Sequence, residues 1–113
     1  MKDEKYSGND FYCDLAIAGK LDLEKEYESD VVLAYHHTKP FWPVHIVVVP
    51  KQHIASLTTL EDMEIARELL DVLQQIAGKV ELEYGAARVL TNLGEYQDSK
   101  HLHFHISSGK PRA

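Results

Sequence analysis

The sequence has little cysteine, no long apolar run and no excess of basic residues. Cys13 is its one cysteine, which excludes a disulfide within one chain and a zinc site built from several cysteines. The longest apolar run is Ile46–Pro50, too short to cross a membrane, and the first ten residues lack an apolar signal segment. We therefore expect a cytoplasmic protein without a membrane partner.

The charge balance argues against a nucleic-acid partner. The chain carries 18 acidic and 12 basic residues, for a net charge of −6, and the acidic residues are scattered. Proteins bind a nucleic-acid backbone through basic patches, so any phosphate recognised here must be bound locally. With 113 residues, 44% of them hydrophobic, the chain fits one domain over residues 1–113, with residues 1–9 as a flexible N-terminus.

Apolar periodicity predicts an α+β domain with the order helix, three strands, long helix and two strands. The long helix is expected over Leu60–Glu83, begun by a capping box of Thr58 and Glu61 and ended at Gly85. A short helix is expected within residues 10–19. The expected strands are residues 25–29, 31–37, 44–50, 86–94 and 101–107, which would form one five-stranded antiparallel sheet.

The most informative segment is HLHFHIS, residues 101–107. Because strand side chains alternate between faces, His101, His103 and His105 are expected on one face, opposite the apolar residues between them. Three neighbouring imidazoles repel one another if they are protonated, and they need hydrogen-bond partners if they are buried as neutral rings. Because placing them together costs stability, the row indicates a functional role. Two chemistries are open: metal ligation with His45 as a fourth ligand, or nucleophilic catalysis by one imidazole assisted by its neighbours.

The composition just upstream of the three histidines favours catalysis. A metal site would more often include a nearby cysteine or carboxylate, whereas small and neutral hydrogen-bonding residues suit the oxygens of a phosphate. These residues are Asn92, Gly94, Gln97 and Ser99.

HLHFHIS resembles the histidine triad signature, His-x-His-x-His with hydrophobic residues at each x. The resemblance extends to residues 10–19, 29–54 and 88–94, and the length is similar to the small nucleotide-binding branch of the histidine triad family. It implies a hydrolase that acts at the α-phosphorus of a small molecule containing a purine nucleoside monophosphate, such as a phosphoramidate. It also implies no cofactor, and a homodimer in which the two sheets are joined.

The resemblance assigns roles residue by residue. His103 would be the nucleophile that forms a covalent histidyl-nucleotide, and His101, His105 and His45 would position it, contact the phosphate and help the leaving group depart. The residues expected to bind the substrate are Asn92, Gly94, Gln97, Ser99, His37 and Thr38.

Three positions depart from the family pattern. His37 stands where an acidic residue binds the ribose hydroxyls, and Asp98 stands where a serine contacts the phosphate. Cys13 lacks the companion cysteine of zinc-binding members, because Asp10 occupies that position, so no metal is expected. Two alternatives stay open: a catalytically weak nucleotide-binding or interaction module, and a metalloprotein with His45 and the triad as ligands.

The segment TKPFWP, residues 38–43, is expected to be a fixed, non-helical loop because it contains two prolines. Trp42 on this loop either packs within it or contacts a ligand. Of the remaining histidines, His36 is expected beside the nucleoside pocket and His53 in a structural or surface position.

Overall fold

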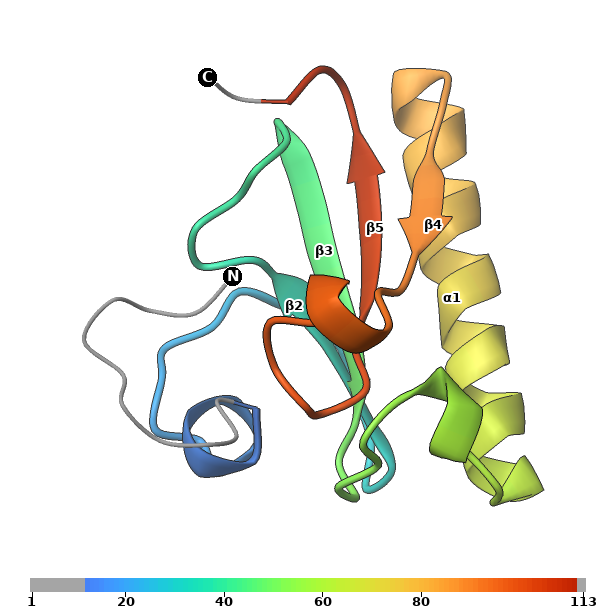
Figure 1. Ribbon diagram of the computed structural model, residues 1–113. Coiled ribbons are helices and arrows are strands. Elements are labelled where there is room, and N and C mark those ends of the chain that lie inside the picture. The colour runs from blue at the N-terminus through green and yellow to red at the C-terminus, as the bar shows by residue number, and fades with distance from the viewer. Residues whose placement is uncertain (1–11, 112–113) are drawn as a thin grey trace.

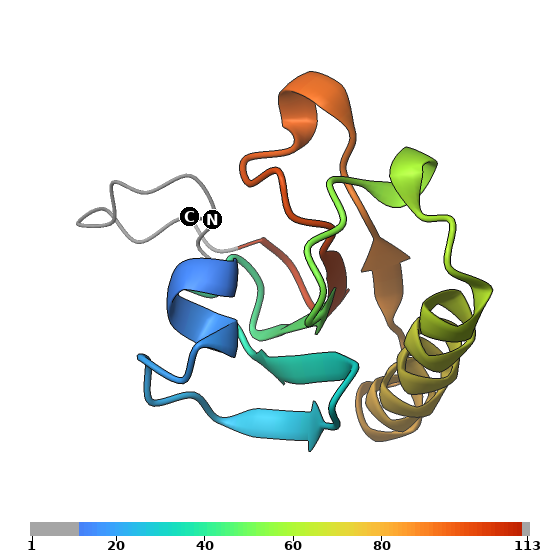
Figure 2. The ribbon, with the colours of Figure 1, turned by 90° about the horizontal axis from the view of Figure 1, so that it is seen from below.

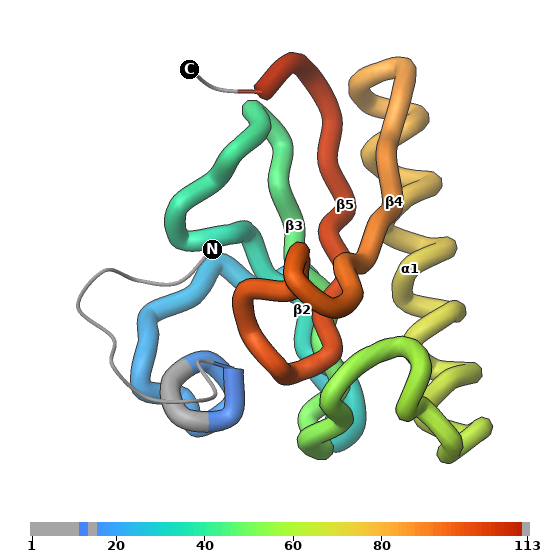
Figure 3. The backbone as a smooth tube through the Cα atoms, viewed as in Figure 1, coloured from blue at the N-terminus to red at the C-terminus, as the bar shows by residue number. Residues whose placement is uncertain are grey.

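A computed structural model describes residues 12–111, apart from the side chains of residues 14 and 15 (Figures 1 and 3). The order of elements is the one predicted, while the predicted flexible segment 1–9 lies outside the described residues. The elements are η1 (Tyr12–Ile17), β1 (Lys25–Glu28), β2 (Val32–His36), β3 (Val44–Pro50), η2 (Leu57–Thr59), α1 (Met63–Tyr84), β4 (Arg88–Leu90), η3 (Gly94–Tyr96) and β5 (Phe104–Ser108).

The five strands form one sheet in the order β1-β2-β3-β5-β4, and all neighbouring strands are antiparallel. This confirms the predicted α+β class and the five-stranded sheet. β3, which is rich in β-branched residues, lies at the centre and pairs with β5, so that Val47 lies opposite His105 and His45 opposite Ser107. The register therefore brings histidines from distant parts of the sequence onto neighbouring strands.

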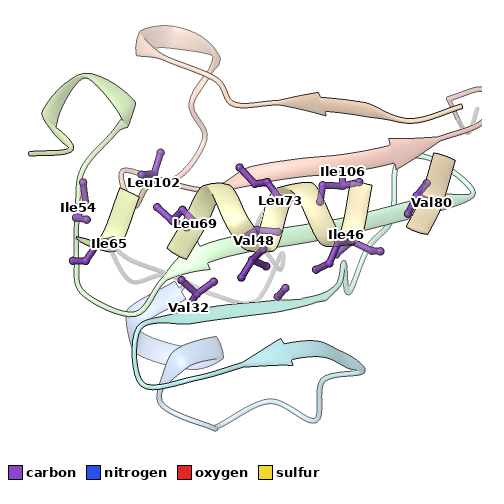
Figure 4. Packing of buried hydrophobic residues seen from close by; sticks show 13 residues of the cluster. Val32, Ile46, Val48, Ile54, Ile65, Leu69, Leu73, Val80, Leu102 and Ile106 are labelled. Carbon is purple, nitrogen blue, oxygen red and sulfur yellow. The ribbon is translucent and has the colours of Figure 1, made fainter. Parts of the chain in front are cut away.

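The sheet has two covered faces, with α1 on one and η1 on the other (Figure 2). Along β3, Ile46 and Val48 face α1, whereas Val47 and Val49 join Tyr12 on the η1 side. Figure 4 shows the α1 side, where the helix packs on the sheet through an apolar stripe. The buried residues of this stripe are Ile65, Leu69, Val72, Leu73, Ile76 and Val80.

Helix α1 begins later than the sequence predicted. Its N-cap is Asp62, whose carboxylate accepts hydrogen bonds from two N–H groups of the first turn, and the predicted capping box of Thr58 and Glu61 is wrong. The helix ends at Tyr84, and Gly85 stops it in the left-handed conformation with φ of 85°. None of the helices between residues 12 and 111 combines the length and the apolar character needed to span a membrane.

Strand β5 begins at Phe104, three residues later than predicted. The N–H group of Leu102 donates to the carbonyl oxygen of Ile54 at 2.6 Å, so the chain before Phe104 leaves the β ladder. The predicted alternation nevertheless holds: Leu102 and Ile106 are buried in the core on the α1 side (Figure 4), and Phe104 packs against it. The histidines between them lie away from this core.

Replacing Leu69 with alanine tests the contribution of the α1 stripe. The Leu69 side chain is 2% exposed, so Leu69→Ala leaves a cavity and should lower the free energy of unfolding by about 2–5 kcal/mol. Its neighbour Leu70 is 57% exposed, and Leu70→Ala should cost less than about 0.5 kcal/mol. Urea denaturation followed by circular dichroism measures both; equal losses would contradict this packing.

Candidate active site

A cleft of about 170 Å³ lies where loop 37–43 and the η3 segment meet strands β3, β4 and β5. Two of the predicted catalytic histidines line it, together with one predicted substrate-binding residue. Its lining residues are His45, Leu90, Asn92, Asp98 and His105 and the aromatic residues Phe41, Trp42 and Tyr96.

Two buried histidines of the cleft form a directed hydrogen-bond chain. The backbone N–H of Phe41 donates to Nδ1 of His45 at 3.0 Å, so a neutral His45 carries its proton on Nε2. That Nε2 lies 2.7 Å from Nδ1 of His105 and donates to it. His105 must then carry its own proton on Nε2, which makes it a hydrogen-bond donor.

His103 is held with the opposite tautomer of its ring. Its Nδ1 lies 2.7 Å from the carbonyl oxygen of His101 and donates to it, so the lone pair of a neutral ring lies on Nε2. The residue is 1% exposed, and within the described part of the chain its Nε2 has no hydrogen-bond partner. The Tyr12 ring packs 4.9 Å from the imidazole, and Thr91 donates to the His103 carbonyl at 2.7 Å. In a neutral ring, Nε2 is thus the nitrogen whose lone pair could act as a nucleophile.

Asp98 lies directly beside this nitrogen. Its Oδ1 is 3.5 Å from Nε2 of His103, which is longer than an ordinary hydrogen bond, and its side chain is 45% exposed. When Nε2 of His103 carries a proton, contact with this ring holds the pKa of the Asp98 carboxyl below its usual range, and the carboxyl is ionised at neutral pH. A negative charge therefore stands next to the candidate nucleophile.

The ring of His101 does not line the cleft. Its Nε2 donates to the carbonyl oxygen of Pro50 at 2.8 Å, and its Nδ1 lies 3.3 Å from the Cys13 sulfur. His101 contributes to the arrangement through its backbone carbonyl, which accepts from His103. The sequence pattern predicted the face on which the ring lies but not this backbone contact.

Cys13, His53 and His101 form a possible metal cluster, with one donor atom from each within 4.8 Å of the others. A structural zinc site takes four ligands, and the described residues bring three together here. The position of the missing cysteine, Asp10, lies outside them. The donor set is thus incomplete as described. His45 and His105, the ligands of the metalloprotein alternative, are hydrogen-bonded to each other at 2.7 Å.

His37 lies behind His45 rather than in the lining of the cleft. Its ring stacks on that of His45 with centroids 4.4 Å apart, and its Nδ1 accepts from the N–H of Lys39 at 2.9 Å. Burial lowers the pKa of His37 to about 3, so the ring is neutral. Its neighbour Thr38 is exposed.

The four residues predicted upstream of the triad occupy different environments. Asn92 lines the cleft, whereas Gly94 begins the short η3 turn. Gln97 is buried and donates to the carbonyl oxygen of Ala55 at 2.6 Å. The Ser99 hydroxyl is buried and, among the residues described, finds no hydrogen-bond partner. Thus one of the four, Asn92, reaches the cleft directly.

His36 is not beside the cleft, so that expectation is wrong. It ends β2 on the α1 side of the sheet, where its Nε2 lies 2.8 Å from a carboxylate oxygen of Glu26 and where it lines a pocket together with Val80 of α1. The alternation of side chains along β2 explains the error, because His36 and His37 point to opposite faces. His53 is exposed, in agreement with a surface position.

Loop 37–43 forms one wall of the cleft through Trp42. The Trp42 ring lies 4.9 Å from that of His45 and meets the Phe41 ring edge-on at 4.8 Å. The Arg88 guanidinium lies 5.3 Å from the centre of the Trp42 ring, so an edge strand holds the loop.

The position of this loop depends on a glycine after β5. Gly109 has φ of 92°, and a Cβ atom there would lie 2.9 Å from Cγ of Pro43. A side chain at this position would therefore be strained and would collide with the loop.

Sequence reasoning missed three contributors: the N–H of Phe41, the ring of Tyr12, and Tyr96 at the mouth of the cleft. The N–H of Phe41 could not be predicted as a donor, because every residue except proline has a backbone N–H group. Tyr12 belongs to the predicted N-terminal helix, but it contacts His103 on the η1 side of the sheet, about ninety residues away in sequence.

The fold and this cluster of histidines define a histidine triad protein. A family model described as the HIT domain matches residues 19–112. An uncharacterized HIT-like protein of Synechococcus elongatus is 38% identical over 90 residues, covering 77% of this chain and 79% of the relative. The chain belongs to the HIT domain family.

Solved structures share the fold. A histidine triad protein from Clostridium difficile has a TM-score of 0.76 and 35% identity, and the match covers 96% of each chain. A protein described as a HIT family hydrolase from Clostridium thermocellum has a TM-score of 0.72 and 29% identity, covering 93% of this chain and 94% of that one.

Acid should destabilise the protein because the site histidines are buried as neutral rings. Burial lowers the pKa of His45 to about 4 and that of His105 to about 3. Below pH 6.5 the unfolded state binds protons that the folded state does not, so the free energy of unfolding falls, by about 2 kcal/mol per histidine at pH 5. Urea denaturation at pH 7 and pH 5 should show this loss, and His105→Asn should reduce it. Equal losses in both proteins would contradict the assignment.

Proposed function

We propose that the protein hydrolyses a nucleoside phosphoramidate or a related nucleotidyl bond through a covalent histidyl-nucleotide on His103. One observation carries the proposal: Nδ1 of His103 donates to a backbone carbonyl, which leaves the lone pair of a neutral ring on Nε2, an atom 3.5 Å from a carboxylate oxygen of the cleft residue Asp98. A neutral imidazole in this state is a competent nucleophile toward phosphorus. The Clostridium thermocellum relative, described as a hydrolase, supports this class of activity.

In the first step, Nε2 of His103 forms a bond to the α-phosphorus. The phosphorus–nitrogen bond of the substrate breaks, and the electron pair leaves with the amine, which takes up a proton from solvent. The Nε2–H of His105, fixed by its bond to His45, donates to the phosphoryl oxygen or the departing group. His101 contributes by holding His103 through its carbonyl.

In the second step, water attacks the phosphorus of the histidyl-nucleotide. The bond to His103 breaks, its electron pair returns to Nε2, and the nucleoside monophosphate leaves as a proton from the water passes to solvent. Asn92 lines the cleft and is proposed to contact the phosphate or the leaving group. Gly94, Gln97 and Ser99 are proposed to shape the segment that binds the phosphate of the substrate. His37 and Thr38 are proposed to shape the part of the site that binds the nucleoside.

Replacing His103 tests the nucleophile. His103→Ala should lower the hydrolysis of an adenosine 5′-phosphoramidate at least about a thousandfold, because removal of a nucleophile eliminates the covalent route. The matched control is His36→Ala, which removes a histidine on the α1 side of the sheet, outside the lining of the cleft, and should leave the rate unchanged. Intact-mass spectrometry after rapid quenching should show a nucleotidyl adduct on the wild type and none on His103→Ala. Unchanged turnover in His103→Ala would refute the proposal.

A nucleotide-binding module with little catalysis is the second candidate. The observation that favours it is the Asp98 carboxylate, which lies 3.5 Å from the attacking nitrogen and opposes an anionic phosphate there. Calorimetric binding of a nucleoside monophosphate without turnover of the phosphoramidate would favour this candidate.

We also propose that the protein acts as a cytoplasmic homodimer whose sheets join through β4. β4 is an edge strand, and Val89 on it is 48% exposed. An edge strand presents unpaired backbone groups that readily pair with a second copy. A single cysteine suits a reducing compartment.

A charge on this edge should weaken the dimer. Val89→Lys is expected to shift the protein toward the monomer because a lysine at a sheet edge opposes pairing. Leu57→Lys changes an apolar residue of η2 that is 43% exposed and lies outside the sheet, so it should leave the dimer intact. Size-exclusion chromatography with light scattering gives the mass. A monomeric wild type, or a dimer insensitive to Val89→Lys, would contradict this interface.

A further inference from the structure

Arg88 of β4 lies on the same face of the sheet as the site histidines, although it does not line the cleft. Ser107 of β5 pairs with Arg88 on one side and with His45 of β3 on the other, so the three residues form one row across the sheet. Side chains directly opposite one another on neighbouring strands point to the same face. The long arginine side chain therefore extends from the edge strand toward the loop beside His45.

The guanidinium of Arg88 makes three contacts beside loop 37–43. One terminal nitrogen donates to the Ser107 hydroxyl at 3.0 Å, and the other donates to the carbonyl oxygen of Gly109. The central carbon lies 5.3 Å from the centre of the Trp42 ring, within the range of a cation–π contact. The two acceptors orient the planar group, and its charge attracts the ring.

The carbonyl that accepts from Arg88 belongs to the residue on which the loop packs. A Cβ atom at Gly109 would lie 2.9 Å from Cγ of Pro43, so this backbone and the proline ring are in close contact. Arg88 thus holds the loop at two points, directly through Trp42 and indirectly through the backbone of Gly109. Removing the guanidinium would release both points.

Two groups of the held segment contact His45. The N–H of Phe41 donates to Nδ1 of His45 at 3.0 Å, and the Trp42 ring lies 4.9 Å from the imidazole. Because that N–H keeps the proton of a neutral His45 on Nε2, it also determines the hydrogen bond from His45 to His105. A displaced loop would leave both rings free to exchange tautomers.

We propose that Arg88 is a positioning residue of the active site, which holds loop segment 41–43 and thereby the proton on His45 and the donor on His105. Arg88 acts through the loop and touches no reacting atom. Its effect on the tautomers depends on the contacts above alone, whereas its effect on the rate rests on the proposed hydrolase function. A lysine would not replace it fully, because an ammonium group lacks the planar fork.

Fluorescence of Trp42 reports the position of the loop, because the chain contains a single tryptophan. Arg88→Met keeps most of the length of the side chain and removes the guanidinium. It should shift the emission to longer wavelength and increase quenching by acrylamide, since the half-buried ring becomes more accessible to water.

Nitrogen NMR of histidine-labelled protein reports the tautomers. At pH 7 both His45 and His105 are neutral, because burial lowers their pKa to about 4 and about 3. The wild type should show each ring as one Nε2–H tautomer, and Arg88→Met should show a mixture. His45→Asn and His105→Asn assign the signals.

The hydrolysis of an adenosine 5′-phosphoramidate gives the third readout. Arg88→Met should lower kcat about tenfold, the effect of losing one cation–π contact and the two hydrogen bonds of the fork. Arg88→Lys, which keeps the charge, should recover part of this loss. In a Trp42→Leu background Arg88→Met should cost only about threefold, since the two residues are coupled. An equal loss in both backgrounds would contradict action through Trp42.

Two variants control for charge and for the strand edge. Arg67→Met removes an exposed arginine of α1, and Val89→Lys alters β4 beside Arg88 but on the opposite face of the sheet. Both should keep the Trp42 emission of the wild type. A shift in Val89→Lys equal to that in Arg88→Met would assign the loop position to the edge and overturn the proposal. If circular dichroism shows that Arg88→Met does not fold, Ser107→Ala, which removes one acceptor of the fork, decides by the same measurements.

The outcomes separate the inference from the function on which it rests. Unchanged emission and unchanged tautomers in Arg88→Met would overturn the positioning role and leave the hydrolase proposal standing. A shifted emission with unchanged tautomers would overturn it as well. If the wild type hydrolyses no phosphoramidate, the hydrolase proposal fails, and fluorescence and nitrogen NMR still decide the role of Arg88.

Discussion

The hydrogen bond from Nδ1 of His103 to the carbonyl oxygen of His101 determines where the lone pair of the site lies. A carbonyl can only accept, so the proton stays on Nδ1 and Nε2 is left for chemistry. The bond forms between residues two apart, where the chain has left the β ladder because Leu102 donates to Ile54 instead. The irregular approach to β5 is therefore a requirement of the site, since a regular strand would direct this carbonyl elsewhere.

The other histidines show how burial and polarity are reconciled. A buried imidazole is costly unless its nitrogens find partners, and His45 satisfies this condition with the N–H of Phe41 on one side and His105 on the other. The same burial keeps both rings neutral, so they can lie close together without repulsion. Stability and tautomer are thus set by one chain of hydrogen bonds that begins at a backbone amide.

The sequence predicted those features that depend on periodicity and residue type. The sheet, the long helix and the alternation in HLHFHIS follow from apolar spacing, and the resemblance in residues 29–54 and 101–107 indicated the family. Spacing failed where hydrogen bonds compete locally: Asp62 caps α1 in place of Thr58, and the bond from Leu102 shortens β5. It also could not locate the ring of His101 or the contact of Tyr12, because both depend on packing between distant segments.

Gly109 shows that the site reaches beyond the residues that touch it. Its lack of a side chain allows Pro43 to lie against the backbone after β5, and Pro43 belongs to the loop that supplies the N–H of Phe41. The proton position on His45 thus depends on a glycine that lies outside the lining of the cleft. Among relatives, a substitution at this glycine would change the chemistry of the cleft while every cleft residue stayed the same. A residue-by-residue inventory of active sites would not register that change.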